Sequence, residues 1–163
     1  MLAKDALKLG LASTQNLVSS YLADLSDYDI TVRPVPGANN IAWQIGHLIE
    51  GEGYLGSVLP GAAYPELPSS LKGQYGKETA ATAPSGGFLS KAQYLEWFNK
   101  VRAASIAVVD KLTDADLDKP NSGPMAKFAP NIAGLIVLMT NHTMMHAGQF
   151  TVVRRLLNKP VIM

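Results

Sequence analysis

The sequence predicts an all-α protein, an antiparallel four-helix bundle with a long crossover connection between its second and third helices. Four segments carry apolar side chains at alternating spacings of three and four residues, the pattern of helices that bury one face. No segment shows the convincing two-residue alternation of a half-buried strand. The chain of 163 residues is long enough for one real core, so we expect residues 1–163 to form a single domain.

The first two helices are expected at about residues 3–27 and 41–58. Between them, "TVRPVPGANN" contains two prolines and a glycine that stop regular structure, and Asn39 or Asn40 can cap the second helix. The second helix ends near "LPG". The stripe on the first helix consists of Leu7, Leu11, Thr14, Val18, Tyr21 and Leu25.

A long connection follows from residue 59 to 87, with four prolines, five glycines and no sustained period. This segment, with Tyr64 and Tyr75, is predicted either to cover a site and select substrates or only to span the bundle or pack against a second subunit. The third helix is expected at about 91–112, with Ser90 and Gln93 in capping-box form.

Prolines limit "TDADLDKPNSGPMAKFAP" to one short turn, which begins with the capping pair Thr113 and Asp116. The last helix is then expected at about 131–157, with Asn158 as its stop. Its predicted interior stripe consists of Leu135, Met139, His142, His146, Gln149, Val153 and Leu156.

Composition excludes several classes of function. The formal net charge is +1 and no basic patch is concentrated enough to follow a phosphate backbone, so we expect no nucleic-acid partner. No signal-peptide pattern and no apolar run of about 18 residues occur, so we expect a cytoplasmic protein with no membrane partner. The chain contains no cysteine, so a bound metal must have nitrogen and oxygen ligands.

Two of the three histidines lie in "NHTMMHAGQF", spaced four residues apart on the predicted interior stripe. An imidazole buried without a partner costs on the order of 1–3 kcal/mol, and a divalent ion would satisfy the pair formed by His142 and His146. The remaining histidine, His47, lies in the second helix on a stripe with Trp43, Glu50 and Tyr54.

Three imidazoles suit zinc, nickel or iron and leave a coordination position open for water or substrate. The alternative is that each histidine is an ordinary hydrogen-bonded side chain, in the core or on the surface. Spacing alone does not decide between these two interpretations.

Two segments, "NNIAWQIGHLIEGEGYLG" and "NHTMMHAGQFTVVRRLLNKP", resemble the second-helix and fourth-helix signatures of the DinB-like superfamily. The order and length of the helices also resemble that family. The resemblance implies an antiparallel four-helix bundle with an unusual crossover, in which His47, His142 and His146 are the metal ligands.

The resemblance also implies a reaction. Some members of the family are S-transferases or isomerases that use a low-molecular-weight thiol, whose pKa the metal lowers. We therefore expect a thiol-dependent transferase acting on a small-molecule substrate, with a metal-dependent hydrolase or a non-catalytic metal-binding or small-molecule-binding bundle as alternatives. A homodimer is expected by resemblance alone.

Four further residues are candidates for the site. Gln149 is predicted either to bond a ligating imidazole, a bound water or the substrate, or to be a buried amide bonded to a neighbouring helix. Glu50 is expected to be a fourth ligand, a general base or an acceptor for a ligating histidine, unless it faces solvent. Trp43 and Tyr54 are expected to line a pocket or to belong to the core.

Overall fold

The computed structural model describes residues 2–123 and 125–161, and within these ranges it contains helices and no strand. Four long helices form a bundle: α1 (Ala3–Leu22), α2 (Ile41–Gly56), α3 (Lys91–Lys111) and α5 (Ile132–Leu156). The short elements are η1 (Asp29–Thr31), η2 (Lys77–Thr79) and α4 (Asp114–Leu117). The predicted all-α class and the four-helix bundle with a long crossover between its second and third long helices are confirmed.

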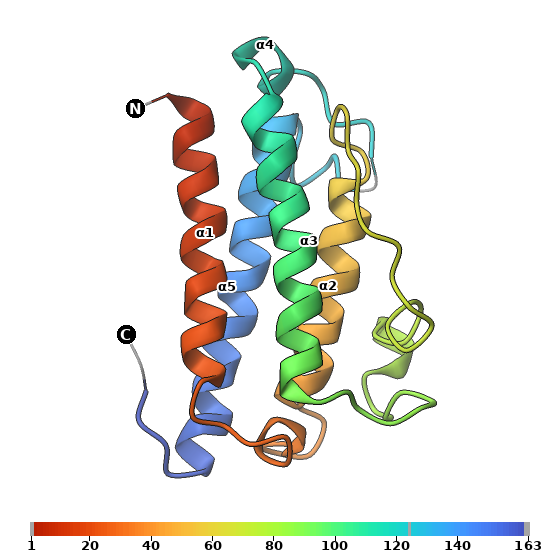
Figure 1. Ribbon diagram of the computed structural model, residues 1–163, viewed down its shortest axis with the longest axis vertical. Helices are drawn as coiled ribbons and strands as arrows, with labels where there is room; N and C mark the ends of the chain where they lie inside the picture. The colour runs from red at the N-terminus through yellow and green to blue at the C-terminus, as the bar shows by residue number, and fades with distance from the viewer. Residues whose placement is uncertain (1, 124, 162–163) are drawn as a thin grey trace.

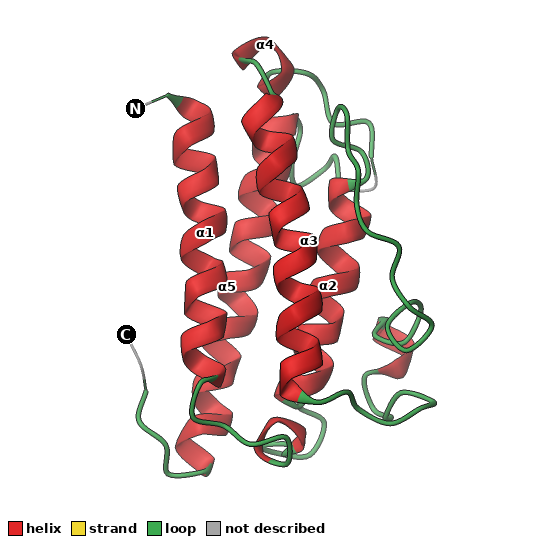
Figure 2. Cartoon of the chain, in the orientation of Figure 1, coloured by secondary structure: helices red, strands yellow, loops and turns green. Residues whose placement is uncertain are grey.

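The helices are arranged so that α1 and α2 each pack against both α3 and α5. In Figure 1, α1 and α5 run in one direction, whereas α2 and α3 run in the other. Because α2 and α3 are both adjacent and parallel, residues 57–90 have to return along the outside of the bundle. Figure 2 shows this crossover as an almost continuous loop, interrupted by η2.

Side-chain caps define where the helices begin. Asn40 accepts a hydrogen bond from the Trp43 amide over 2.8 Å, and Asn131 accepts one from the Gly134 amide over 2.8 Å. Ser90 forms the predicted capping box on α3. Each cap stabilises its helix by about 1 kcal/mol, so residues with capping side chains are preferred at helix starts. This preference is what makes the starts recognisable in the sequence.

The end of α1 differs from the prediction, because the helix stops at Leu22 and not near residue 27. The buried Arg154 guanidinium donates to the Tyr21 carbonyl over 2.6 Å and to the Asp24 carboxylate over 2.6 Å. These long-range bonds satisfy the helix end and turn the following chain, while Leu25 remains buried as predicted. The α2 helix also ends early, at Gly56.

The predicted core stripe on α1 is confirmed from Leu11 onward. On α5 the predicted stripe is wrong at two positions, because Gln149 and Leu156 are exposed. The buried face instead passes through Thr143, Ala147 and Phe150. A strict alternation of four and three residues averages 3.5, whereas the helix turns every 3.6, so the predicted stripe drifts away from the core.

The crossover is packed onto the bundle through two tyrosines that lie over glycines of α2. The Tyr75 ring occupies the space where a Cβ on Gly46 would come within 2.4 Å of it. Tyr64 lies in the same way over Gly56, and its hydroxyl bonds to Ser105 on α3 over 2.9 Å. The crossover therefore has a defined position on α2 and α3.

A buried ion pair joins all four long helices. Arg102 of α3 donates to the Glu52 carboxylate of α2 over 2.7 Å, and to Thr143 of α5 over 2.9 Å. It also donates to Thr14 and the Leu11 carbonyl of α1, each over 2.8 Å. Such a pair specifies how the helices are arranged more than it stabilises them, because burying both charges costs several kcal/mol per ion.

The described helices include none whose length and apolar character together would suffice to cross a lipid bilayer.

Candidate metal centre

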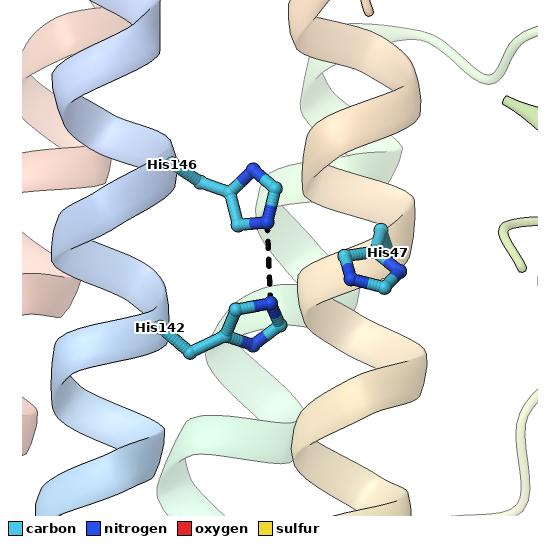
Figure 3. Close-up of side chains that lie close together, drawn as sticks. All are labelled: His47, His142 and His146. Carbon is cyan, nitrogen blue, oxygen red and sulfur yellow. Dashed lines mark hydrogen bonds between the residues drawn. The ribbon is translucent and has the colours of Figure 1, made fainter. Parts of the chain in front are cut away.

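The three histidines meet between α2 and α5. His142 and His146 project from successive turns of α5, and His47 faces them from α2 (Figure 3). One nitrogen from each ring can be chosen so that all three lie within 4.8 Å of one another. The Nε2 atoms of His142 and His146 are 3.2 Å apart.

Hydrogen bonds at the opposite ring nitrogen fix the tautomers of two of these histidines. His146 Nδ1 is 2.9 Å from Gln44 Oε1, and His47 Nδ1 is 2.9 Å from the Tyr75 carbonyl oxygen. Since both partners are acceptors, each Nδ1 carries the proton and each Nε2 presents a lone pair. His142 Nε2–H can then donate to His146 Nε2 when no metal is bound.

This donor set fits a divalent metal. In a tetrahedral zinc site with Zn–N distances of about 2.0–2.1 Å, neighbouring nitrogens lie about 3.3 Å apart. The Nε2 separation in the pair on α5 has nearly this value, 3.2 Å. Ligating histidines in proteins also commonly donate their other N–H to a carbonyl or carboxylate, as His47 and His146 do here.

The electrostatic environment keeps the pair on α5 neutral. Burial, followed by the nearby His47, lowers the pKa of His142 to about 4. Burial, followed by the nearby His142 and His47, lowers the pKa of His146 to about 3. Both imidazoles therefore offer unprotonated nitrogen at neutral pH, the form that binds metal.

Glu50 lies one turn beyond His47, but its carboxylate is engaged elsewhere. It accepts hydrogen bonds from the backbone amides of Gly73 and Tyr75, the latter over 2.9 Å. Among the described residues, the group of potential ligands comprises the three histidines without Glu50. Glu50 thus holds the segment of the crossover whose Tyr75 carbonyl orients His47, and it is not directed at the candidate ligand nitrogens.

The two aromatic candidates on α2 differ in their surroundings. Trp43 is buried and stacks on His47, with ring centroids 5.0 Å apart and planes inclined by 10°. Tyr54 is 61% exposed and lines the cleft beside the histidines. Trp43 therefore belongs to the core, where it packs on His47, and it does not line the cleft. Tyr54 lines the cleft, the other of the two predicted alternatives.

Gln149 does not occupy the interior position expected for it, because its side chain is exposed. The amide that contacts a histidine is Gln44, which is buried on α2. Its Nε2 donates to the Asn39 carbonyl over 3.0 Å, so its oxygen is directed toward His146. The signal for Gln44 in the sequence was its position, one helical turn before His47.

A cleft of about 700 Å³ opens beside the histidines. This volume is within the usual range for small-molecule sites. His47 and His142 lie in its wall, together with apolar residues of α2 and α5 and with Lys77 of the crossover. The crossover was predicted as one candidate to cover a site, but a segment without a period does not indicate that Lys77 and the Tyr75 carbonyl are the groups that lie there.

Two helices of the bundle supply imidazoles that converge beside an open cleft. The protein is therefore a helical bundle with a candidate histidine metal site. The family model of the DinB superfamily matches residues 11–150. The chain belongs to the DinB superfamily, as the resemblance of its two histidine-bearing segments predicted.

Solved structures share the fold. A conserved protein from Enterococcus faecalis superposes with a TM-score of 0.73 at 16% identity, covering 98% of this chain and 99% of that one. YfiT from Bacillus subtilis, described as a probable metal-dependent hydrolase with an unusual four-helix bundle topology, gives 0.69 at 15%, covering 96% and 89%. A DinB-like protein from Bacillus cereus gives 0.65 at 19%, covering 94% and 91%. No curated protein matches the sequence.

Proposed function

We propose that this protein is a divalent-metal-dependent enzyme that activates an external nucleophile, with S-transfer from a low-molecular-weight thiol as its leading reaction. The observation that carries the proposal is the convergence of three imidazoles, two of them oriented through Nδ1, beside an open cleft. Zinc, nickel and iron are the candidate ions.

His47, His142 and His146 would hold the ion. An ion bound there would act as a Lewis acid and lower the pKa of a thiol or water at its open position. Gln44 and the Tyr75 carbonyl keep the Nε2 lone pairs of His146 and His47 available. The largely apolar cleft leaves room for an organic nucleophile beside its acceptor.

One feature favours a thiol over water. The chain has no cysteine, so a sulfur nucleophile would have to enter with the substrates, but this fact fits an external thiol without distinguishing it from water. The described residues that line the cleft include no carboxylate that could serve as a general base for water. In the transfer, the thiol proton leaves to solvent, sulfur bonds to the electrophilic carbon, and the leaving group departs with its electron pair.

Hydrolysis is the second candidate, and the description of YfiT as a probable metal-dependent hydrolase favours it. The same three histidines would then hold the ion, and water would occupy the open position. The two reactions differ in whether turnover requires a thiol.

The test compares the two reactions on protein loaded with zinc, nickel or iron(II). One assay supplies 2-mercaptoethanol and 1-chloro-2,4-dinitrobenzene, and the other supplies p-nitrophenyl butyrate without thiol. We expect metal-dependent thioether formation that His146→Ala abolishes. Turnover of the ester alone would favour the hydrolase, and failure to bind any of the three ions would overturn the proposal.

A further inference from the structure

The cleft beside the histidines has a composition that suggests its substrate class. The surface that its walls expose is mainly apolar, and Leu55, Leu138, Met125 and Met145 contribute aliphatic and thioether side chains to it. An apolar wall of this kind gains free energy by removing hydrocarbon from water, at roughly 25 cal/mol per Å². Two methionines allow the wall to adapt to different hydrocarbon shapes.

The described lining of this cleft carries a positive charge and no negative one. Among its described lining residues, Lys77 is the only one with a permanent charge, and no carboxylate lies in the wall. No described acidic side chain lies within salt-bridge distance of the Lys77 ammonium. Lys77 is exposed at the cleft, so an anionic group bound there would pair with its ammonium.

The segment that carries Lys77 is held against the site. Thr79, in the same 3-10 helix η2, bonds to the indole nitrogen of Trp43 over 3.3 Å. Trp43 in turn stacks on His47. Glu50 binds the chain just before η2 through the Tyr75 amide. The backbone that carries Lys77 is therefore held by hydrogen bonds to α2, the helix that carries His47.

We propose that the cleft binds amphiphilic carboxylates, with the hydrocarbon body along its apolar wall and the carboxylate paired with Lys77. The inference rests on the proposed function, since it assigns the substrate class of that same site. Lys77 is then a specificity-determining residue that selects acids over neutral compounds of equal length, and the histidines remain free to face the reacting group.

The test measures binding by calorimetry to the full chain, both zinc-loaded and chelator-treated, with octanoate, octan-1-ol and acetate as probes. We expect octanoate to bind both forms about tenfold or more tightly than acetate. Lys77→Gln should weaken octanoate binding about threefold to fivefold and leave octan-1-ol binding unchanged. The matched control Lys72→Gln removes an exposed lysine of the same crossover that does not line the cleft, and should change neither.

A second variant locates the binding. Met145 is 56% exposed, so Met145→Ala should fold normally while removing part of the wall. It should weaken octanoate and octan-1-ol binding by the same factor. Equal affinity of wild type for these two probes, or an unchanged octanoate affinity in Lys77→Gln, would overturn the inference.

The two forms of the protein separate this inference from the proposed function. Octanoate binding to the chelator-treated protein supports the substrate class even if no turnover is found. Octanoate that binds only the zinc-loaded form would show the carboxylate on the metal and not on Lys77, and would overturn the inference while leaving the proposed function intact.

Discussion

At the scale of single residues, the acceptors at Nδ1 matter as much as the histidines themselves. A neutral imidazole has one lone pair, and a hydrogen bond from Nδ1–H leaves that lone pair on Nε2. Gln44 does this for His146, and the Tyr75 carbonyl does it for His47. The site is thus partly preorganised before a ligand arrives, which lowers the entropy that binding has to overcome.

This orientation leads to a prediction for Gln44. The change Gln44→Met conserves volume but removes the acceptor for His146 Nδ1–H, so the ring can rotate or change tautomer. We expect zinc affinity to fall about 10-fold to 100-fold, the usual effect of losing a partner of a ligating histidine. Competition with a chelator of known affinity measures it.

Gln15→Met is the matched control, because Gln15 bonds Asn99 on the surface, with no bond to a ligand histidine. It should leave zinc affinity unchanged. Gln44→Glu keeps an acceptor for His146 and should bind zinc more tightly than Gln44→Met. Wild-type affinity in Gln44→Met would show that the hydrogen bond does not orient the site.

The roles of these residues show what a sequence can and cannot reveal about the site. His142 and His146 are neighbours on one helix, so their spacing alone brings them together. The same spacing places Glu50 and Gln149 one turn from a histidine, but Glu50 binds the crossover and Gln149 is exposed. Spacing states which residues share a helix face, and it does not state which partner from another element takes their hydrogen bonds.

At the scale of the elements, the crossover depends on two glycines of α2 that make room for tyrosine rings. Gly46 accommodates Tyr75, whose hydroxyl bonds to Tyr94 on α3 over 2.7 Å. The backbone of Tyr75 meets Glu50 and His47. The packing of the Tyr75 ring over Gly46 therefore couples the position of the crossover to His47, a candidate ligand.

Substitution of Gly46 tests that coupling. A Cβ at Gly46 would come within 2.4 Å of the Tyr75 ring, so Gly46→Ala must displace it. We expect a loss of about 1–3 kcal/mol in the free energy of unfolding from overpacking, despite the higher helix propensity of alanine. Urea denaturation of chelator-treated protein measures this, and zinc affinity should fall as His47 loses its acceptor.

Gly53 provides the control on the same helix, because a Cβ there meets nothing within 4 Å. Gly53→Ala should stabilise the protein by about 0.5–1 kcal/mol through helix propensity alone. If the two substitutions changed stability equally, the packing of Tyr75 over Gly46 would not hold the crossover.

The elements themselves were largely readable from the sequence, because their signals are local. Caps at Asn40 and Ser90 and the stop at Asn158, whose φ of 54° lies in the left-handed region, depend on residues within one turn. The end of α1 was not readable, since Arg154 from the far end of the chain satisfies it. Boundaries set by long-range partners leave no local pattern.

At the scale of the whole molecule, the buried Arg102 and the histidine site are two polar regions within one bundle. Thr143, which accepts a bond from Arg102, lies between His142 and His146 in the sequence of α5. Because Arg102 also binds α1 and α2, the rotation of α5 about its axis is constrained by the remaining helices. The bundle thereby fixes which face of α5 presents its histidines to α2.

Placing these histidines inside the bundle makes the stability of the metal-free protein depend on pH. In the unfolded chain an imidazole has a pKa of about 6.5. Burial, followed by neighbouring histidine charge, lowers the pKa of His142 to about 4 and that of His146 to about 3 in the folded protein. Between these values the unfolded chain binds more protons than the folded one, so stability falls as pH falls.

We therefore expect the urea midpoint of chelator-treated wild type to decrease steadily from pH 7 to pH 4. The double variant His142→Gln and His146→Gln should show a shallower decrease, since it lacks both imidazoles. The difference between the two slopes isolates these histidines from other titrating groups, such as Glu52, whose pKa burial raises. Parallel slopes would mean that the pair protonates in the folded bundle as easily as in the unfolded chain, and the site would then be too open to hold its imidazoles neutral for a metal.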